Sequence, residues 1–174
     1  MAIKIAFAGT GYINKIHAQA ARVSGANLTA VVNHKAESMA EFAKQFEVPR
    51  QYATVDELLK AGGLDALVVS TPNYLHAAQT IAALNAGVHV LVEKPISMNA
   101  AEAKQMWDAA QKSGAKLMVA HCWRFDPEAI WLRGRIAADK IGKIIRTKGC
   151  GVHVNWGPGG WFTQKQFAGG GAMA

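Results

Sequence analysis

The amino-acid sequence predicts an α/β fold with a doubly wound parallel sheet, followed by the incomplete start of an α+β domain. Three observations lead to this prediction. Short apolar runs alternate with segments of helical spacing over residues 1–122, which is typical of β–α–β units. A glycine-rich turn separates the first apolar run from the first helical segment. Polar motifs follow two later apolar runs directly, where an open α/β sheet binds its ligands.

The apolar runs are expected to form buried strands, at residues 3–8, 27–33, 65–70, 88–93 and 116–122. Helical segments alternate with these strands, at residues 12–23, 36–46, 54–62, 74–87 and 99–114. Two of the helices open on a capping signal, because Thr54 and Asn99 are each followed three residues later by a glutamate. The connections between parallel strands should be right-handed, with helices on both faces of the sheet.

The pattern changes after residue 122. Residues 126–142 are expected to form one helix with Pro127 in its first turn, residues 143–156 look like a strand, and the remainder is loop-rich. This second region has the elements of a new structural layer, one helix and one strand, but too few to complete it. We therefore divide the chain into a first domain at 1–122 and the truncated start of a second domain at 123–174.

The basic charge of the chain does not indicate a nucleic-acid partner. The formal net charge of the 174 residues is +7, and such a balance can favour nucleic acids. The basic residues are dispersed, however, and the densest stretch, residues 133–148, has no interleaved aromatics for base stacking. A solvated helix face and an adjoining strand explain this stretch more simply.

The sequence also carries no membrane or metal signal. No apolar run approaches the roughly 20 residues of a membrane span, and the N-terminus lacks the features of a signal peptide, so we expect a cytoplasmic location. Cys122 and Cys150 have no metal-like spacing. Both are interpreted as reduced structural cysteines, and no metal site is expected.

The stretch AFAGTGYINKIHA, which follows the first strand, resembles a phosphate-binding turn. Gly9 and Gly11 occupy the first two glycine positions of G-x-G-x-x-G, where they permit a tight turn and the close approach of a pyrophosphate to the helix N-terminus. Asn14 replaces the third glycine. It should push the helix slightly outward or turn its amide toward the cofactor. The alternative is a glycine-rich turn that binds no ligand.

The end of the second strand bears on the choice between NAD and NADP. An acidic residue usually binds the adenosine ribose there, but this chain has Asn33, followed by His34 and Lys35. A neutral amide does not repel a 2′-phosphate, and the two basic neighbours can pair with it. We therefore expect NADP in preference to NAD; the alternative is a polar turn with a solvent-facing lysine.

Two further motifs stand at predicted strand ends: STPNYLH at residues 70–76 and VEKP at residues 92–95. Lys94 is an unusual choice at the end of a buried strand, because a buried lysine costs free energy unless it is paired or works near neutrality. It is a candidate catalytic residue. The alternative is an ordinary surface lysine.

The motifs G-T-G-Y-I-x-K-I-H, T-P-N-x-x-H, E-K-P and H-x-x-R-F, in this order and spacing, resemble those of the Gfo/Idh/MocA oxidoreductases, relatives of glucose–fructose oxidoreductase and inositol dehydrogenase. The resemblance covers the whole chain. It implies a Rossmann domain and a second, α+β domain that supplies much of the substrate pocket and often the oligomer interface. It also implies a homo-oligomer at full length and a sugar or polyol substrate.

The resemblance implies a role for each matching residue. The dinucleotide loop would comprise Gly9, Thr10, Gly11, Tyr12 and Ile13, and the ribose or 2′-phosphate site would comprise Asn33, His34 and Lys35. The loop around the cofactor's ribose and phosphates would comprise Ser70, Thr71, Pro72, Asn73 and His76. Glu93 and Lys94 match E-K-P, with a cis Lys94–Pro95 bond and the lysine reaching the nicotinamide ribose and the substrate hydroxyl. Arg124 would lie near the nicotinamide or substrate.

Four other residues are interpreted mainly as packing: His17, His121, Trp123 and Trp161. The implied reaction is hydride transfer between the nicotinamide and a carbon of a sugar or polyol, in which a base must take the hydroxyl proton.

The chain ends within a further motif of the resemblance, G-G-G-x-x-x-D-x-G-x-H. Residues 169–174 match its first six positions, so we expect the chain to lack the aspartate and histidine that follow. Without these two residues, the isolated chain is expected to be an inactive part of an oxidoreductase. The alternative reading is a non-catalytic dinucleotide-binding module.

Overall fold

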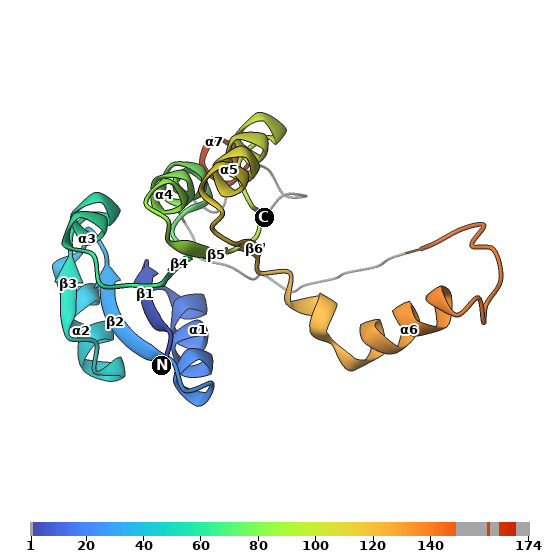
Figure 1. The fold of residues 1–174 in the computed structure, drawn as a ribbon, viewed down its shortest axis with the longest axis horizontal. Coiled ribbons are helices and arrows are strands. Elements are labelled where there is room, and N and C mark those ends of the chain that lie inside the picture. Colours follow the sequence, from blue (N-terminus) through green and yellow to red (C-terminus); the bar gives the residue numbers. More distant parts are fainter. Residues whose placement is uncertain (1, 149–159, 161–163, 170–174) are drawn as a thin grey trace. The chain divides into compact units, whose positions relative to one another are not determined.

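The computed structural model describes residues 2–148, 160 and 164–169 (Figure 1). These residues form two compact units. The larger unit comprises residues 1–120 together with the described residues near the end of the chain, and the smaller unit begins at His121. Each unit is treated by itself below. Whether residues 123–174 begin a separate substrate domain stays a prediction.

The larger unit is built on a six-stranded sheet in which every neighbouring pair of strands is parallel. The strands stand in the order β3-β2-β1-β4-β5-β6. Their bounds are β1 Lys4–Ala8, β2 Asn27–Val32, β3 Arg50–Tyr52, β4 Ala66–Val69, β5 His89–Val92 and β6 Leu117–Val119. The order departs in both directions from β1, which confirms the doubly wound sheet predicted from the sequence.

Helices cover both faces of this sheet (Figure 1). On one face α1 (Tyr12–Val23) and α2 (Ala36–Phe46) enclose a core around Phe7, Val31 and Phe42. On the other face α3 (Val55–Ala61), α4 (Asn73–Asn85) and α5 (Ala100–Ser113) enclose a larger core that includes Leu67, Val92 and Met106. Alternate residues of β1, β4 and β5 enter opposite cores, as the two-residue period of a strand requires.

The predicted capping signals are confirmed. The Thr54 hydroxyl accepts a hydrogen bond from the Glu57 amide at 3.2 Å, and the Asn99 side chain accepts one from the Glu102 amide at 3.0 Å. These bonds satisfy backbone donors that a helix N-terminus leaves without intrahelical partners. The bounds of α1 and α2 coincide with the predicted ranges, because both helices carry clear amphipathic spacing and end in a turn.

The later elements differ from the prediction. Strand β3 was missed because it is short and carries little apolar pattern, and its pairing with β2 defines it. The helix predicted over 126–142 is shorter: α6 spans Pro127–Ala137 and follows a 3₁₀ helix at Cys122–Phe125. Within the described residues, 143–148 form no strand, and the rest of that predicted strand lies outside them. The predicted loop after residue 157 contains a short helix, α7 (Lys165–Ala168).

Across the part of the chain that the structure describes, no helix is both long and apolar enough to span a membrane.

Candidate functional site

The candidate site lies where the chain leaves β1 and β4, which are neighbours at the centre of the sheet. Helix α1 follows β1 onto one face, and α4 follows β4 onto the opposite face. The two connections therefore diverge at the carboxyl edge, and in open α/β sheets such a divergence forms the crevice that binds the ligand. Backbone bonds hold the strand ends together there, from the Gly9 amide to the Val32 carbonyl at 2.9 Å and from the Ser70 amide to the Ala8 carbonyl at 3.0 Å.

Gly9 and Gly11 are glycines for different reasons. Gly9 has a φ of +98°, and a Cβ atom there would lie 2.8 Å from the carbonyl oxygen of Ser70. The fold itself therefore requires glycine at residue 9. Gly11 has an ordinary φ of −67°, and a Cβ atom there would meet no protein atom within 4 Å. Neither backbone conformation nor internal packing explains Gly11, whereas a closely approaching ligand does.

The N-terminus of α1 is suited to an anion. Gly11 is its N-cap, no side chain caps the helix, and no acidic residue lies in its first turn. The amides and the positive end of the helix dipole are thus left for a negatively charged group. Across the crevice the Ser70 hydroxyl is buried and makes no hydrogen bond within the described part of the protein. These features fit the pyrophosphate and ribose of a dinucleotide.

Asn14 has a structural role that the sequence analysis did not anticipate. Its side chain is fully buried, and its amide nitrogen donates hydrogen bonds to the carbonyls of Ala8 at 3.0 Å and Gly9 at 2.7 Å. The expectation that this amide turns toward the cofactor is wrong for its nitrogen atom. Asn14 instead ties the first turn of α1 to the end of β1. It gives the Gly9 carbonyl a donor and the Ala8 carbonyl, which also accepts the Ser70 amide, a second one.

At the end of β2, Asn33 joins two loops of the site. Its amide nitrogen donates to the Thr10 hydroxyl, and its side-chain oxygen accepts the Lys35 amide at 3.0 Å. The second amide proton and the second oxygen lone pair are still available to a ribose hydroxyl. His34 and Lys35 are exposed beside it, so a phosphate could reach both side chains.

The turn that carries Lys94 follows β5 at the same edge of the sheet. The Lys94–Pro95 peptide bond is cis, as predicted. Lys94 is exposed, so the cost of burying a lysine, from which its function was argued, does not arise in this chain. Its amide donates to the Glu93 carboxylate at 3.1 Å. Lys94 therefore has the accessibility that contact with a substrate requires.

His17, which was interpreted as a packing residue, belongs to this group. Its Nε2 atom lies 2.8 Å from the other oxygen of Glu93, and both side chains are largely buried. The hydrogen bond connects α1 to the E-K-P turn across 76 residues of sequence. The available signal was helical spacing, because His17 lies three residues after the buried Asn14, on the same side of α1.

The first turn of α4 contributes two buried polar side chains from the T-P-N-x-x-H motif, Asn73 and His76. The Asn73 amide nitrogen donates to the Ala168 carbonyl at 2.9 Å, and the neighbouring ring of Tyr74 packs against Phe167 with a centroid distance of 5.4 Å. Helix α7 is thereby held on α4. Asn73 thus has a protein partner in addition to its predicted place beside the cofactor.

Each ring nitrogen of His76 faces a backbone carbonyl. The Nδ1 atom is 2.8 Å from the Pro95 oxygen, and the Nε2 atom is 2.8 Å from the Thr71 oxygen. Burial lowers the pKa of this imidazole, while the two carbonyls and the charge of Glu93 act in the opposite direction. The geometry shows contacts with the backbone of two site loops.

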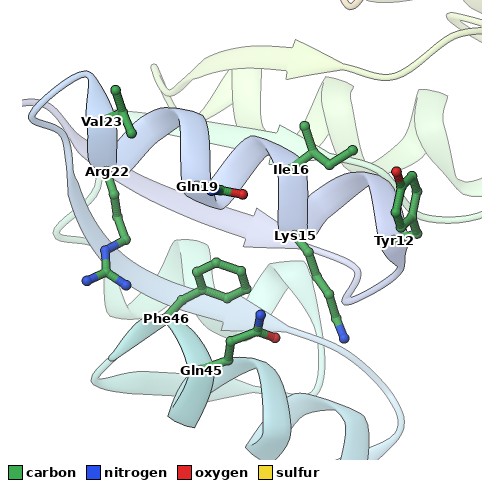
Figure 2. Close-up of a pocket in the computed structure, with 8 residues that line it drawn as sticks. All are labelled: Tyr12, Lys15, Ile16, Gln19, Arg22, Val23, Gln45 and Phe46. Atoms are coloured by element: carbon green, nitrogen blue, oxygen red, sulfur yellow. The ribbon is translucent and has the colours of Figure 1, made fainter.

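A separate groove of about 640 Å³ runs along α1 from Tyr12 to Val23. Figure 2 shows Lys15 and Arg22 reaching from α1 toward α2 on either side of the Phe46 ring. Among the described residues, its lining includes Tyr12 but no part of the motifs that follow β4 and β5. We therefore do not assign the dinucleotide to this groove.

The remaining candidates do not all lie in the larger unit. Tyr12 and Ile13 are exposed in the first turn of α1. Arg124 is exposed in the 3₁₀ helix of the smaller unit, together with His121 and Trp123 at its start, and its proposed contact with nicotinamide or substrate stays a prediction. Trp161 lies outside the described residues. No group of three or more potential metal-binding side chains occurs among the residues that the structure describes.

Comparison with characterised proteins identifies the family of the chain. The profile of the Gfo/Idh/MocA oxidoreductase family, described as having an NAD-binding Rossmann fold, matches residues 3–121. The chain is 34% identical over 157 residues to a 1,5-anhydro-D-fructose reductase of Ensifer adhaerens, covering 88% of this chain and 46% of that protein. It is 33% identical over 145 residues to an NADP(+)-dependent scyllo-inositol 2-dehydrogenase of Bacillus subtilis, covering 83% and 44%.

Solved structures show the same fold. A scyllo-inositol dehydrogenase from Lactobacillus casei, with bound NAD(H) and scyllo-inositol, superposes with a TM-score of 0.76 at 27% identity, over 82% of this chain and 43% of that one. The WlbA dehydrogenase from Bordetella pertussis, in complex with NADH and UDP-GlcNAcA, has a TM-score of 0.76 at 28% identity, over 82% and 44%. The chain spans less than half the length of these relatives. With the crevice, the glycine turn and the family match in agreement, the chain belongs to the Gfo/Idh/MocA family of oxidoreductases.

Proposed function

We propose that the chain is the dinucleotide-binding part of an NAD(P)-dependent oxidoreductase that transfers a hydride between the nicotinamide and a sugar, polyol or related hydroxyl compound. The observation that carries the proposal is the pairing of Gly11 with an uncapped α1 N-terminus at the crevice. Relatives named for an anhydro sugar and for an inositol support the substrate class.

Different residues would bind the pyrophosphate, the ribose and the substrate. The backbone of residues 9–13 would hold the pyrophosphate, because its amides point from a helix N-terminus. Ser70 and its loop would contact the ribose from the opposite side of the crevice. A bound dinucleotide would supply the hydride acceptor or donor. Lys94, accessible at the end of β5, would hold the substrate hydroxyl and polarise it as the hydride leaves.

We further propose that the chain prefers NADP to NAD. Asn33 presents no negative charge to a 2′-phosphate, and His34 and Lys35 are exposed beside it. A charge-assisted bond from the lysine to the phosphate would contribute to NADP affinity alone. Lys35→Ala should therefore weaken NADPH binding by about tenfold and leave NADH binding unchanged.

The control for this experiment is Lys44→Ala, which removes an exposed lysine from the last turn of the same helix, α2. Fluorescence titration of both variants and the unaltered chain with NADPH and NADH gives the six affinities needed. If Lys35→Ala loses the same affinity for NADPH and for NADH, the 2′-phosphate contact is refuted. If Lys44→Ala weakens NADPH binding as much as Lys35→Ala does, the loss is a general effect of charge.

The same titration tests the proposed function. The 174-residue chain should bind NADPH or NADH, and failure to bind either would refute the cofactor assignment. Turnover separates an oxidoreductase from a non-catalytic dinucleotide-binding module. Oxidation of sugars and polyols, measured as reduced nucleotide formed, would exclude the module, whereas binding without turnover is expected both of the module and of the dinucleotide-binding part alone. Lys94→Ala should abolish any turnover while the nucleotide affinity is retained.

A further inference from the structure

His76 occupies a position that an apolar side chain would ordinarily fill. It is 1% exposed, and the residues that follow it on the same side of α4, Ala77, Thr80 and Leu84, are also buried. A polar ring in such a place costs free energy unless hydrogen bonds compensate it. The ring nitrogens of His76 each lie 2.8 Å from a backbone carbonyl. A neutral imidazole carries one N–H and donates to one of these carbonyls, and this hydrogen bond is that compensation.

The two carbonyls belong to the two loops of the candidate site. Thr71 lies in the loop after β4, and Pro95 directly follows Lys94 in the loop after β5. Beyond their strand ends, these loops have no sheet pairing to fix their separation. The planar imidazole places one nitrogen against each loop, so its rigid ring sets the distance between them.

The Lys94 turn is held on its other side as well. The Glu93 carboxylate accepts the Lys94 amide and bonds to His17 on α1. The backbone around Lys94 is therefore fixed before the residue by Glu93 and after it by the bond to the Pro95 carbonyl. These contacts determine where the long side chain of Lys94 starts.

We propose that His76 is a positioning residue that joins the Lys94–Pro95 turn to the Ser70–Asn73 loop, so that the lysine and the dinucleotide-binding loop keep one geometry. The inference rests on the proposed function, because it assigns His76 to the site that would bind dinucleotide and substrate. His76 acts through the backbone: its ring nitrogens contact the two carbonyls rather than a ligand.

The chain offers a matched control in Thr80, one turn further along α4. Thr80 is fully buried, and its hydroxyl makes no hydrogen bond to any described residue. Thr80→Val thus removes a buried polar atom from the same helix without removing a contact between loops. His76→Phe keeps a planar ring but loses the ring N–H and both nitrogen contacts. His76→Gln keeps a side-chain donor that can replace the N–H.

The experiment combines backbone NMR with nucleotide titration on the 174-residue chain. His76→Phe should shift the amide signals of Lys94 and Ile96 in the absence of nucleotide, and should weaken NADPH binding by about fivefold, the effect of one lost hydrogen bond. His76→Gln should recover part of the affinity, and Thr80→Val should change neither the signals nor the affinity.

Three results would overturn the inference. Unchanged Lys94 and Ile96 signals in His76→Phe would remove the link to the lysine, whatever happens to the affinity. If Thr80→Val changes the amide signals and the NADPH affinity as much as His76→Phe does, His76 has no role beyond packing in the core. If both His76 variants unfold, the test is the rate at which the His76 ring N–H of the unaltered chain exchanges with solvent. Rapid exchange would contradict a hydrogen bond to a carbonyl, and slow exchange would support it.

The failure of this inference is distinguishable from the failure of the proposed function. If the unaltered chain binds neither NADPH nor NADH, the cofactor assignment fails, while the amide signals still report whether His76 positions the turn. If the nucleotide binds and the signals do not respond to His76, only the positioning role fails.

Discussion

Exchanging Gly9 and Gly11 for alanine, one at a time, should separate the needs of the fold from the needs of the ligand. For Gly11→Ala two small effects on stability oppose each other. Alanine is a poorer N-cap than glycine, but it reduces the conformational entropy of the unfolded chain by about 0.4–1 kcal/mol. The new methyl group meets no protein atom within 4 Å. The free energy of unfolding should therefore change by less than about 1 kcal/mol.

Nucleotide binding by Gly11→Ala should suffer far more than stability. The methyl group would occupy the space through which the pyrophosphate approaches the α1 amides. A hydrogen bond to a charged group contributes about 1.5–3 kcal/mol, so the loss of a single one raises the dissociation constant by about 10- to 100-fold.

Gly9→Ala should show the opposite order of effects. A residue with a side chain costs about 1–2 kcal/mol in a left-handed conformation, and the added Cβ would lie 2.8 Å from the Ser70 carbonyl oxygen. Some displacement of the loop after β4 must follow. After the gain from a stiffer unfolded chain, the net loss of stability should be about 1–3 kcal/mol.

Urea denaturation measures the first quantity for both variants, and fluorescence titration with NADPH measures the second. The reasoning predicts that Gly11→Ala is stable and binds poorly, whereas Gly9→Ala is less stable. Wild-type affinity in a folded Gly11→Ala chain would refute the assignment of residue 11 to ligand contact. A Gly9→Ala chain as stable as the unaltered one would refute the claim that the fold requires glycine there.

Three further predictions concern buried polar side chains. Asn14→Ala should lower the free energy of unfolding by about 1–3 kcal/mol in urea denaturation, because the Gly9 carbonyl loses its donor and the Ala8 carbonyl keeps only the Ser70 amide; an unchanged value would contradict the role given to its amide. Asn73→Ala should release α7, so that trypsin cleaves after Lys165 faster than in the unaltered chain, and equal cleavage rates would contradict it. Burial lowers the pKa of His76 below 6.5 despite the opposing effect of Glu93, so that below about pH 6.5 the unfolded chain binds a proton that the folded chain does not. The free energy of unfolding should then fall with decreasing pH by at most about 1.4 kcal/mol per pH unit, and urea titrations of His76→Gln should lack this part of the decline.

Most of the fold could be predicted because its signals are local. Amphipathic spacing gave the bounds of α1 and α2, and the capping signals located the starts of α3 and α5. The errors occur where pairing decides the structure. Strand β3 has only three residues, Arg50–Tyr52, and exists through its pairing with β2. Residues 143–148 have the apolar character of a strand but form none among the described residues, since a strand requires a neighbour.

The candidate site shows the same division. The tight turn at Gly9 follows from a motif of a few residues, and the cis bond before Pro95 from the family resemblance of the E-K-P motif. The structure agrees with both expectations. The bond between His17 and Glu93 spans 76 residues and could not be found from spacing along one helix. Nor could the burial of Asn14, which depends on how closely α1 approaches the end of β1.

The sequence by itself determined the alternation of strands and helices, the glycine turn and the polar motifs at the strand ends, because each depends on backbone preferences and periodicity over a short stretch. The tertiary structure alone decided the partners of the buried polar groups. Bringing β1, β4 and β5 side by side leaves carbonyls and amides at one edge of the sheet without strand partners. Asn14, Glu93 and His76 provide partners for the Gly9 carbonyl, the Lys94 amide and the Pro95 carbonyl, since a polar backbone atom excluded from water must find a partner.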